Sequence, residues 1–256
     1  NSRLSTNSNI SFFKNLSEIN SENSIIFNSV HKEELDKSKL WQHFQGIEIE
    51  TPKNIFDEEI INLMDFNCDQ RKDVHFFYTL PFSKNKALIE TTWLSALEDQ
   101  SLMDYDLQLE NYIKNNLGIK NYKINFTERG AIPLFHPLIK NNKKTVYIGS
   151  AGGMTRLSTG YTFLNIQEHS KYIVENIDKI EKIKMYNIGK KYQFLDKIFL
   201  RVLKNNPDKM PKIFFEMFKT SSSCVIKFLS NKSNIVEDIN IIGRMPKLIF
   251  MRALFQ

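Results

Sequence analysis

The sequence is poor in cysteine and glycine, and it has no long apolar run. Its two cysteines, Cys68 and Cys224, lie far apart without companion cysteines, which argues against a disulfide framework or a zinc site. No apolar run reaches the roughly 18 residues of a spanning helix, and no signal-peptide pattern is present. We therefore expect a protein that neither spans a membrane nor is secreted, and a reducing cytoplasm fits best.

Metal binding is not indicated either. The histidines show no ligand spacing, so we predict no metal site and structural roles for all five. They are His31, His43, His75, His136 and His169.

The chain has enough apolar residues, 41% of 256, for a sizeable core. Its net charge of +6 is uneven: residues 179–256 carry 16 Lys or Arg against 6 Asp or Glu, a net charge of +10, which leaves −4 for residues 1–178. A basic region attracts nucleic acid, anionic lipid or an acidic partner, or is simply solvated. Because nucleic-acid recognition motifs are missing, we predict no nucleic-acid binding.

Alternation of polar and apolar residues predicts a sheet in the first half of the chain. The strand-like regions are 41–50, 74–82, 87–93 and 122–126. A turn at residues 81–85 makes the second and third of them an antiparallel hairpin. Helical spacing from Leu107 to Leu117 ends at Gly118, a typical helix terminator.

The second half is predicted to be mainly helical. A short strand at 145–148 precedes a glycine-rich turn and a helix from about Tyr161 to Ile177. An apolar stripe from Phe194 to Leu203 predicts another helix, which Pro207 ends. Pro211 starts the next one. The fold class is therefore α+β, with an antiparallel sheet and C-terminal helices.

Four of the nine glycines fall within one stretch of 12 residues at this turn: Gly149, Gly152, Gly153 and Gly160. Glycine allows close approach of backbone to a flat or phosphorylated ligand, and a turn that opens a helix directs free amides towards it. The alternative is a capped helix after a tight turn, with Ser158 or Thr159 as the N-cap of a helix that begins near Gly160. The dinucleotide motif GxGxxG is absent.

The run YIGSAGGMTRLSTGYTF at 147–163 resembles the flavin-lining signature of flavoprotein lycopene beta-cyclases, GG-x-T-x-x-STGY-x-F. Blocks in the same order resemble that family from about Ile25 to Phe250. They are WQHFQGIEIET at 41–51, LMDF at 63–66, FFYTLPFS at 76–83, ALIETTWLS at 87–95 and FLRVLKNNPDKMP at 199–211.

The resemblance implies an FAD cofactor in its reduced form, with NAD(P)H as electron source, in an incomplete α/β FAD-binding fold of the flavoprotein hydroxylase or reductase type. The implied flavin contacts are Gly149, Ala151, Gly152, Gly153, Thr155, Ser158, Thr159, Gly160 and Tyr161. It also implies an organisation into FAD-domain strands, a substrate-binding sheet, a second FAD-binding part and a basic helical region. Their ranges are 1–40, 41–130, 131–180 and 181–256.

Two departures from the family concern the cofactor. The strand-turn-helix that holds the ADP half of FAD has no counterpart here, and the chain begins with Asn1, so we expect a fragment or a processed product. Where the family has an Asp-Ser-Arg type sequence, this chain has Asn28 and Val30.

Glu90 is an acid within an apolar strand. Alternation puts Leu88, Glu90 and Thr92 on one face, so this glutamate either points to water from an edge strand or faces an apolar cavity. The resemblance implies the second, because the family has its essential acid in the matching motif. A desolvated carboxyl retains its proton near neutral pH and can protonate an alkene. Asp65 and Asp69 are weaker candidates for positioning roles.

The resemblance thus predicts an isomerase that cyclises lycopene ends to β-rings, with a hydrophobic carotenoid substrate. Its location would be cytoplasmic and peripheral on an anionic membrane, contacted by the basic helices with Phe194, Phe199, Phe214, Phe215 and Phe218 as possible insertions. These aromatics could equally form a helical core. The alternatives for function are a related FAD-dependent isoprenoid reductase or monooxygenase and a non-catalytic membrane-surface module. The sequence does not determine the oligomeric state.

Overall fold

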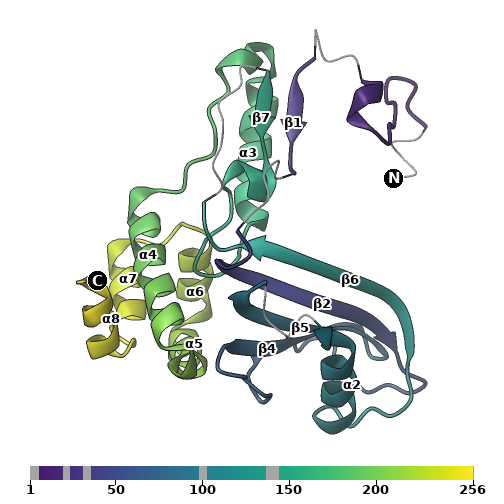
Figure 1. Ribbon diagram of the computed structural model, residues 1–256, viewed down its shortest axis with the longest axis vertical. Coiled ribbons are helices and arrows are strands. Elements are labelled where there is room, and N and C mark those ends of the chain that lie inside the picture. The colour runs from purple at the N-terminus through teal and green to yellow at the C-terminus, as the bar shows by residue number, and fades with distance from the viewer. Residues whose placement is uncertain (1–5, 20–23, 31–35, 98–102, 137–143, 256) are drawn as a thin grey trace.

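The computed structural model describes residues 6–19, 24–30, 36–97, 103–136 and 144–255 (Figure 1). It confirms the α+β class, with an antiparallel sheet followed by C-terminal helices. The helices α4–α8 gather beside the sheet, and β1, β7 and α3 lie together above both of them in the view of Figure 1.

The main sheet has five antiparallel strands in the order β3-β4-β5-β2-β6. Their bounds are Leu40–Glu50 for β2, Asn62–Asp65 for β3, Val74–Ser83 for β4, Lys86–Ala96 for β5 and Lys123–Pro133 for β6. The hairpin predicted around residues 81–85 is the β4–β5 pair. Strand alternation gives this sheet two faces with different partners.

Helix α2, Tyr105–Asn115, covers one face of the sheet. Apolar residues of the strands, among them the fully buried Ile49 and Ile89, pack there against Ile113 of α2. A stack of Phe77 on Tyr112, with ring centroids 3.9 Å apart, joins strand to helix. This face is therefore a closed core, and the opposite face remains for other contacts.

The C-terminal third forms a helical bundle, and its apolar core is continuous with one end of that opposite face. The bounds are Lys190–Asn205 for α4, Met210–Phe218 for α5, Ser222–Leu229 for α6, Ile235–Ile242 for α7 and Lys247–Leu254 for α8. Pro207 follows α4 and Pro211 lies in the first turn of α5, as predicted. Phe76 and Leu94 of the sheet share one buried cluster with Val202 of α4 and Phe214 of α5.

A small parallel pair stands apart from the main sheet. Strand β1, Ile26–Asn28, pairs with β7, Thr145–Tyr147. A 3-10 turn at Gly149–Gly152 follows β7 after a single residue, and ten residues separate this turn from helix α3, Phe163–Glu175. Further 3-10 turns lie at Leu16–Glu18, Ile177–Lys182 and Pro207–Lys209.

Candidate functional site

The glycine turn lies at the carboxyl ends of two parallel strands. The Ile148 amide donates to the Asn28 carbonyl oxygen at 2.9 Å, and Ser29 is the nearest non-adjacent residue to a side chain built on Gly149. The turns that follow β1 and β7 are therefore neighbours. Ligands of open parallel sheets bind at this end of the strands.

Gly153 leaves the turn open to a ligand. Its φ of +71° is left-handed, and apart from its two chain neighbours no atom of the described residues lies within 4 Å of the place that a Cβ would occupy. A flat group could approach the backbone here without displacing protein atoms. On the neighbouring turn, Asn28 uses its side-chain oxygen to accept the Val30 amide at 2.9 Å, and Val30 is exposed.

A buried ion pair holds the loop after the turn against α4. Arg156 is fully buried and donates to both carboxylate oxygens of Asp196, at 2.7 to 3.1 Å. The same carboxylate accepts the Leu157 amide at 3.1 Å and the Ser158 hydroxyl at 2.7 Å. Because a buried charge is costly without a partner, this network fixes the loop's position.

Sequence reasoning missed both members of this pair. Asp196 is an acid on the apolar stripe of α4, beside Ile198 and Phe199, and that was the available signal. For Arg156 we find no comparable signal, since it lies in an irregular loop.

The predicted N-cap was wrong. Helix α3 begins at Phe163 rather than near Gly160, and Thr162 precedes it. Ser158 donates to Asp196, while the Thr159 hydroxyl oxygen accepts the Tyr161 amide at 3.3 Å. Both side chains thus stabilise the loop and do not cap the helix.

Gly160 brings the loop into contact with the main sheet. A Cβ on Gly160 would lie 2.0 Å from Gln42 Oε1 on β2, and its φ of +69° is left-handed. Gly46 lies four residues further along β2 and is paired with Glu90 on β5. At about 3.3 Å per strand residue, the loop contact and the row containing Glu90 are about 13 Å apart.

Glu90 projects from the sheet face opposite α2 and is half-buried there. Burial raises the pKa of its carboxyl to about 7, a hydrogen bond from Thr92 at 2.6 Å opposes the rise, and the charge of Glu128 adds to it. Its other neighbour across the strands is Tyr78, whose pKa burial also raises. Glu90 is thus an acid that retains its proton near neutral pH.

A cavity of about 180 Å³ joins the loop to this face of the sheet. Its lining residues from the sheet include Gln42, Phe76 and Tyr78, those from the loop are Ser158, Thr159 and Tyr161, and those from α5 are Phe214, Met217 and Phe218. Glu90 does not itself line this cavity, but its cross-strand neighbour Tyr78 does.

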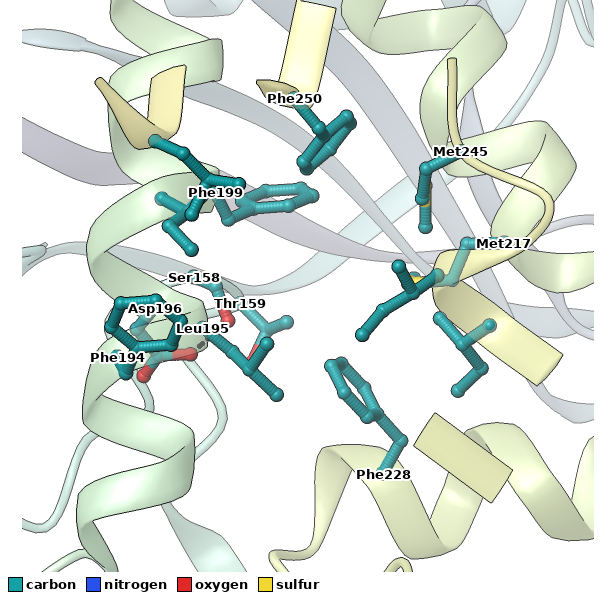
Figure 2. Close-up of a pocket in the computed structure, with 14 residues that line it drawn as sticks. Ser158, Thr159, Phe194, Leu195, Asp196, Phe199, Met217, Phe228, Met245 and Phe250 are labelled. Atoms are coloured by element: carbon teal, nitrogen blue, oxygen red, sulfur yellow. Dashed lines mark hydrogen bonds between the residues drawn. The ribbon is translucent and has the colours of Figure 1, made fainter. Parts of the chain in front are cut away.

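A second cavity of about 210 Å³ lies within the bundle and has almost wholly apolar walls (Figure 2). It shares Ser158, Thr159 and Met217 with the first cavity. Figure 2 shows Phe199 of α4, Phe228 of α6 and Phe250 of α8 around it, together with Met245 from the connection between α7 and α8. The two cavities therefore lie on either side of the same loop.

The weaker carboxylate candidates have structural partners away from Glu90. Asp65 accepts the Tyr112 hydroxyl at 2.6 Å on the α2 side of the sheet. Asp69 lies beside Arg71, with a nitrogen–oxygen distance of 3.6 Å. Like Glu90, neither residue lines the two cavities, and unlike Glu90 neither has a cross-strand neighbour in the sheet face that does.

Two histidines belong to the core under α2. His75 hydrogen-bonds to Thr91 Oγ1 at 2.8 Å and stacks on Trp93, while His43 hydrogen-bonds to Ser95 Oγ at 2.8 Å. His169 contacts the Lys184 carbonyl, His136 is exposed, and His31 lies outside the described residues. Within the described ranges, no three His, Cys, Asp or Glu side chains are grouped to hold a metal ion.

The five aromatics proposed for membrane insertion do not share one environment. Phe199 and Phe214 are buried in the core, so the prediction was wrong for them because they pack between helices and sheet. Phe194 and Phe215 are exposed, and Phe218 is half-buried. Among the described residues, no helix has both the length and the hydropathy to cross a membrane.

Comparison with known proteins supports the resemblance in the sequence. A family model described as lycopene cyclase protein matches residues 20–255. The chain is 31% identical over 132 residues to lycopene beta cyclase of Narcissus pseudonarcissus, a match to 47% of this chain and 26% of that protein. It is 25% identical over 150 residues to neoxanthin synthase of Solanum tuberosum, covering 54% of this chain and 30% of that one.

Among solved structures, a geranylgeranyl bacteriochlorophyll reductase-like protein from Thermoplasma acidophilum is 14% identical, with a TM-score of 0.45. That match covers 85% of this chain and 55% of the other.

Proposed function

The chain belongs to the lycopene cyclase family, and from this membership we propose that it forms part of a carotenoid cyclase that isomerises linear lycopene ends to β-rings. The observation that supports the proposal is Glu90, whose carboxyl has a pKa of about 7 and whose cross-strand neighbour Tyr78 lines the cavity that Ser158, Thr159 and Tyr161 also line. A carboxyl that is still partly protonated at neutral pH, because burial disfavours its charge, is what alkene protonation requires.

In the proposed reaction Glu90 donates its proton to the terminal double bond of the substrate. The resulting cation is attacked by the next double bond, which closes a six-membered ring, and a ring carbon then loses a proton. Tyr78 and Phe76 line the cavity, and their aromatic faces would stabilise the cation. The substrate neither gains nor loses atoms or electrons.

The glycine turn fits the ring end of FAD. Gly153 offers open backbone, Gly149 adjoins the turn after β1, and the loop that follows extends to the sheet at Gln42. The proposed contacts are Gly149, Ala151, Gly152, Gly153, Thr155, Ser158, Thr159, Gly160 and Tyr161. A reduced flavin bound here, with NAD(P)H as its electron source, would supply negative charge that stabilises the cation.

The two cavities suit the rest of a linear polyene. The cavity lined by Tyr78, the cross-strand neighbour of Glu90, would take the reacting end, and the apolar cavity within the bundle would take part of the conjugated chain. The two cavities share three lining residues, Ser158, Thr159 and Met217. A polyene that occupied both cavities would therefore pass these residues.

We propose that the bundle also contacts the membrane that holds the substrate. Large apolar side chains are exposed on α7 and α8, among them Ile235, Ile239, Leu248 and Phe255 at the end of α8. Basic residues of the same region, which carries the +10 charge, would attract anionic lipid.

Sedimentation with anionic vesicles tests this surface. Leu248→Ser should weaken binding about tenfold, because burying one leucine contributes about 1.5 kcal/mol or more. Val174→Ser is the matched control, since Val174 is equally exposed but lies on α3. Equal effects of the two substitutions would contradict the assignment of the surface.

The proposed activity is tested by expressing the complete protein in lycopene-accumulating cells and identifying the pigments. We expect ring-containing carotenoids. A hydrogenated or oxygenated linear product would instead indicate the related reductase or monooxygenase. Unchanged lycopene from a folded protein that binds no flavin would indicate a membrane-surface module.

A further inference from the structure

One row of residues crosses four strands of the main sheet at Glu90. Tyr78 of β4 is paired with Glu90 of β5, Glu90 with Gly46 of β2, and Gly46 with Glu128 of β6. Directly paired residues of neighbouring strands point to the same side of a sheet. The two glutamates therefore share the face opposite α2, with only a glycine between them.

Gly46 leaves space that Glu128 uses. A Cβ on Gly46 would lie 3.2 Å from both Cγ and Oε1 of Glu128 and 3.1 Å from Leu88 Cδ1. The Glu128 side chain thus bends over the glycine, towards the strand that carries Glu90. Glycine weakens the interior of a strand, so its presence at position 46 needs a reason. The φ of Gly46 is not positive, so the backbone conformation does not require glycine. The reason is therefore the space that the missing side chain leaves for Glu128.

The proposed reaction needs two proton transfers at one place. The carbon that gains a proton and the carbon that loses one belong to the same six-membered ring, so the acid and the base must both reach that ring. Glu90 can supply the first proton, but the second transfer needs a carboxylate that is already ionised.

We infer that Glu128 is a second catalytic residue, the base that accepts the proton released by the new ring across the gap at Gly46. This inference rests on the proposed cyclase function. One proton leaves the Glu90 carboxyl for the alkene carbon, one carbon–carbon bond forms, and one proton leaves the ring for the Glu128 carboxylate as the double bond is restored. The proton then returns to Glu90 through water, and no oxidant or reductant is consumed.

The test compares Glu128→Gln with Glu48→Gln in the complete flavin-loaded protein acting on lycopene in vesicles. Glu48 is a matched control, because it lies on β2 one row away on the same face, paired with Leu88 and Phe126. We expect Glu128→Gln to lower kcat about 100-fold or more, as for loss of a general base, with KM and flavin content near those of the parent. Glu48→Gln should stay within about threefold of the parent, well below that general-base effect.

Two further variants separate a chemical role from a structural one. Gly46→Ala keeps both carboxyls but displaces Glu128, and should lower kcat in the same direction. Glu128→Asp shortens the side chain by one methylene, and should retain part of the activity while forming some rings with the double bond in another position.

The outcomes distinguish this inference from the proposed function. If Glu128→Gln cyclises lycopene at the parent rate while Glu90→Gln is inactive, Glu128 is not the base and the cyclase function stands. If Glu128→Gln loses flavin in proportion to activity, its role is structural and the inference is overturned. A parent protein without any cyclase activity would reject the proposed function itself.

Discussion

Glu90→Gln should abolish ring formation and, at the same time, stabilise the protein above neutral pH. The carboxyl has a pKa of about 7 in the folded chain, against an ordinary value of 4.5, chiefly because burial disfavours its charge. The folded state therefore binds this proton more tightly than the unfolded state. Stability linked to Glu90 is fully present below pH 4.5 and is lost as the pH rises towards 7.

The size of the effect follows from the two pKa values. Each pKa unit corresponds to about 1.4 kcal/mol, so ionising Glu90 in the folded protein costs at most about 3 kcal/mol at pH 8. At pH 5 the same calculation gives a cost of less than about 1 kcal/mol for ionising Glu90 in the folded protein. The Glu90 side chain keeps some solvent contact, which reduces this cost. We therefore expect Glu90→Gln to raise the free energy of unfolding by about 1 to 2.5 kcal/mol more at pH 8 than at pH 5.

Urea unfolding at the two pH values measures this difference, and pigment analysis measures cyclisation. Glu48→Gln, which removes a carboxyl from the same face, is the control for general charge effects. The reasoning is refuted if Glu90→Gln changes stability equally at both pH values, because Glu90 would then be an ordinary solvated acid. Retained ring formation would separately remove Glu90 from the mechanism.

Three further predictions concern the surroundings of the site. Asp196→Asn leaves Arg156 buried without its carboxylate and should lower the free energy of unfolding by about 3 to 5 kcal/mol; a loss below about 1 kcal/mol in urea unfolding would contradict this. Gly160→Ala should cost about 1 to 3 kcal/mol, because of its left-handed φ and the contact with Gln42, and adding Gln42→Ser should recover only the part due to the contact. His75 should remain neutral above pH 5 in an NMR titration, because burial lowers its pKa to about 4; protonation near pH 6.5 would show that its core is open to water.

The sheet and helices were largely predictable because local patterns determine them. Strand alternation identified residues 41–50 and 74–82, and the observed strands Leu40–Glu50 and Val74–Ser83 agree within a residue at each end. The stripe from Phe194 to Leu203 likewise predicted the middle of α4.

The predictions failed where long-range contacts decide the outcome. Ser158 has the chemistry of an N-cap, but its hydroxyl instead donates a hydrogen bond to Asp196, 38 residues later in the chain. Phe199 and Phe214 could equally have been surface aromatics, and only packing between α4, α5 and the sheet buries them. Neither competition is visible in a local window of sequence.

The loop at residues 156–160, between the two cavities, is held in a fixed position relative to Glu90 from two sides. From one side the carboxylate of Asp196 fixes Arg156 and Ser158, and from the other Gly160 rests on Gln42 of β2. Both supports belong to regular elements, α4 and β2, so the loop's place relative to Glu90 is set by packing. The contact at Gln42 and the row that contains Glu90 are about 13 Å apart along β2, so the same strand fixes the position of both. Weakening either support should therefore reduce cyclisation even when Glu90 keeps its pKa.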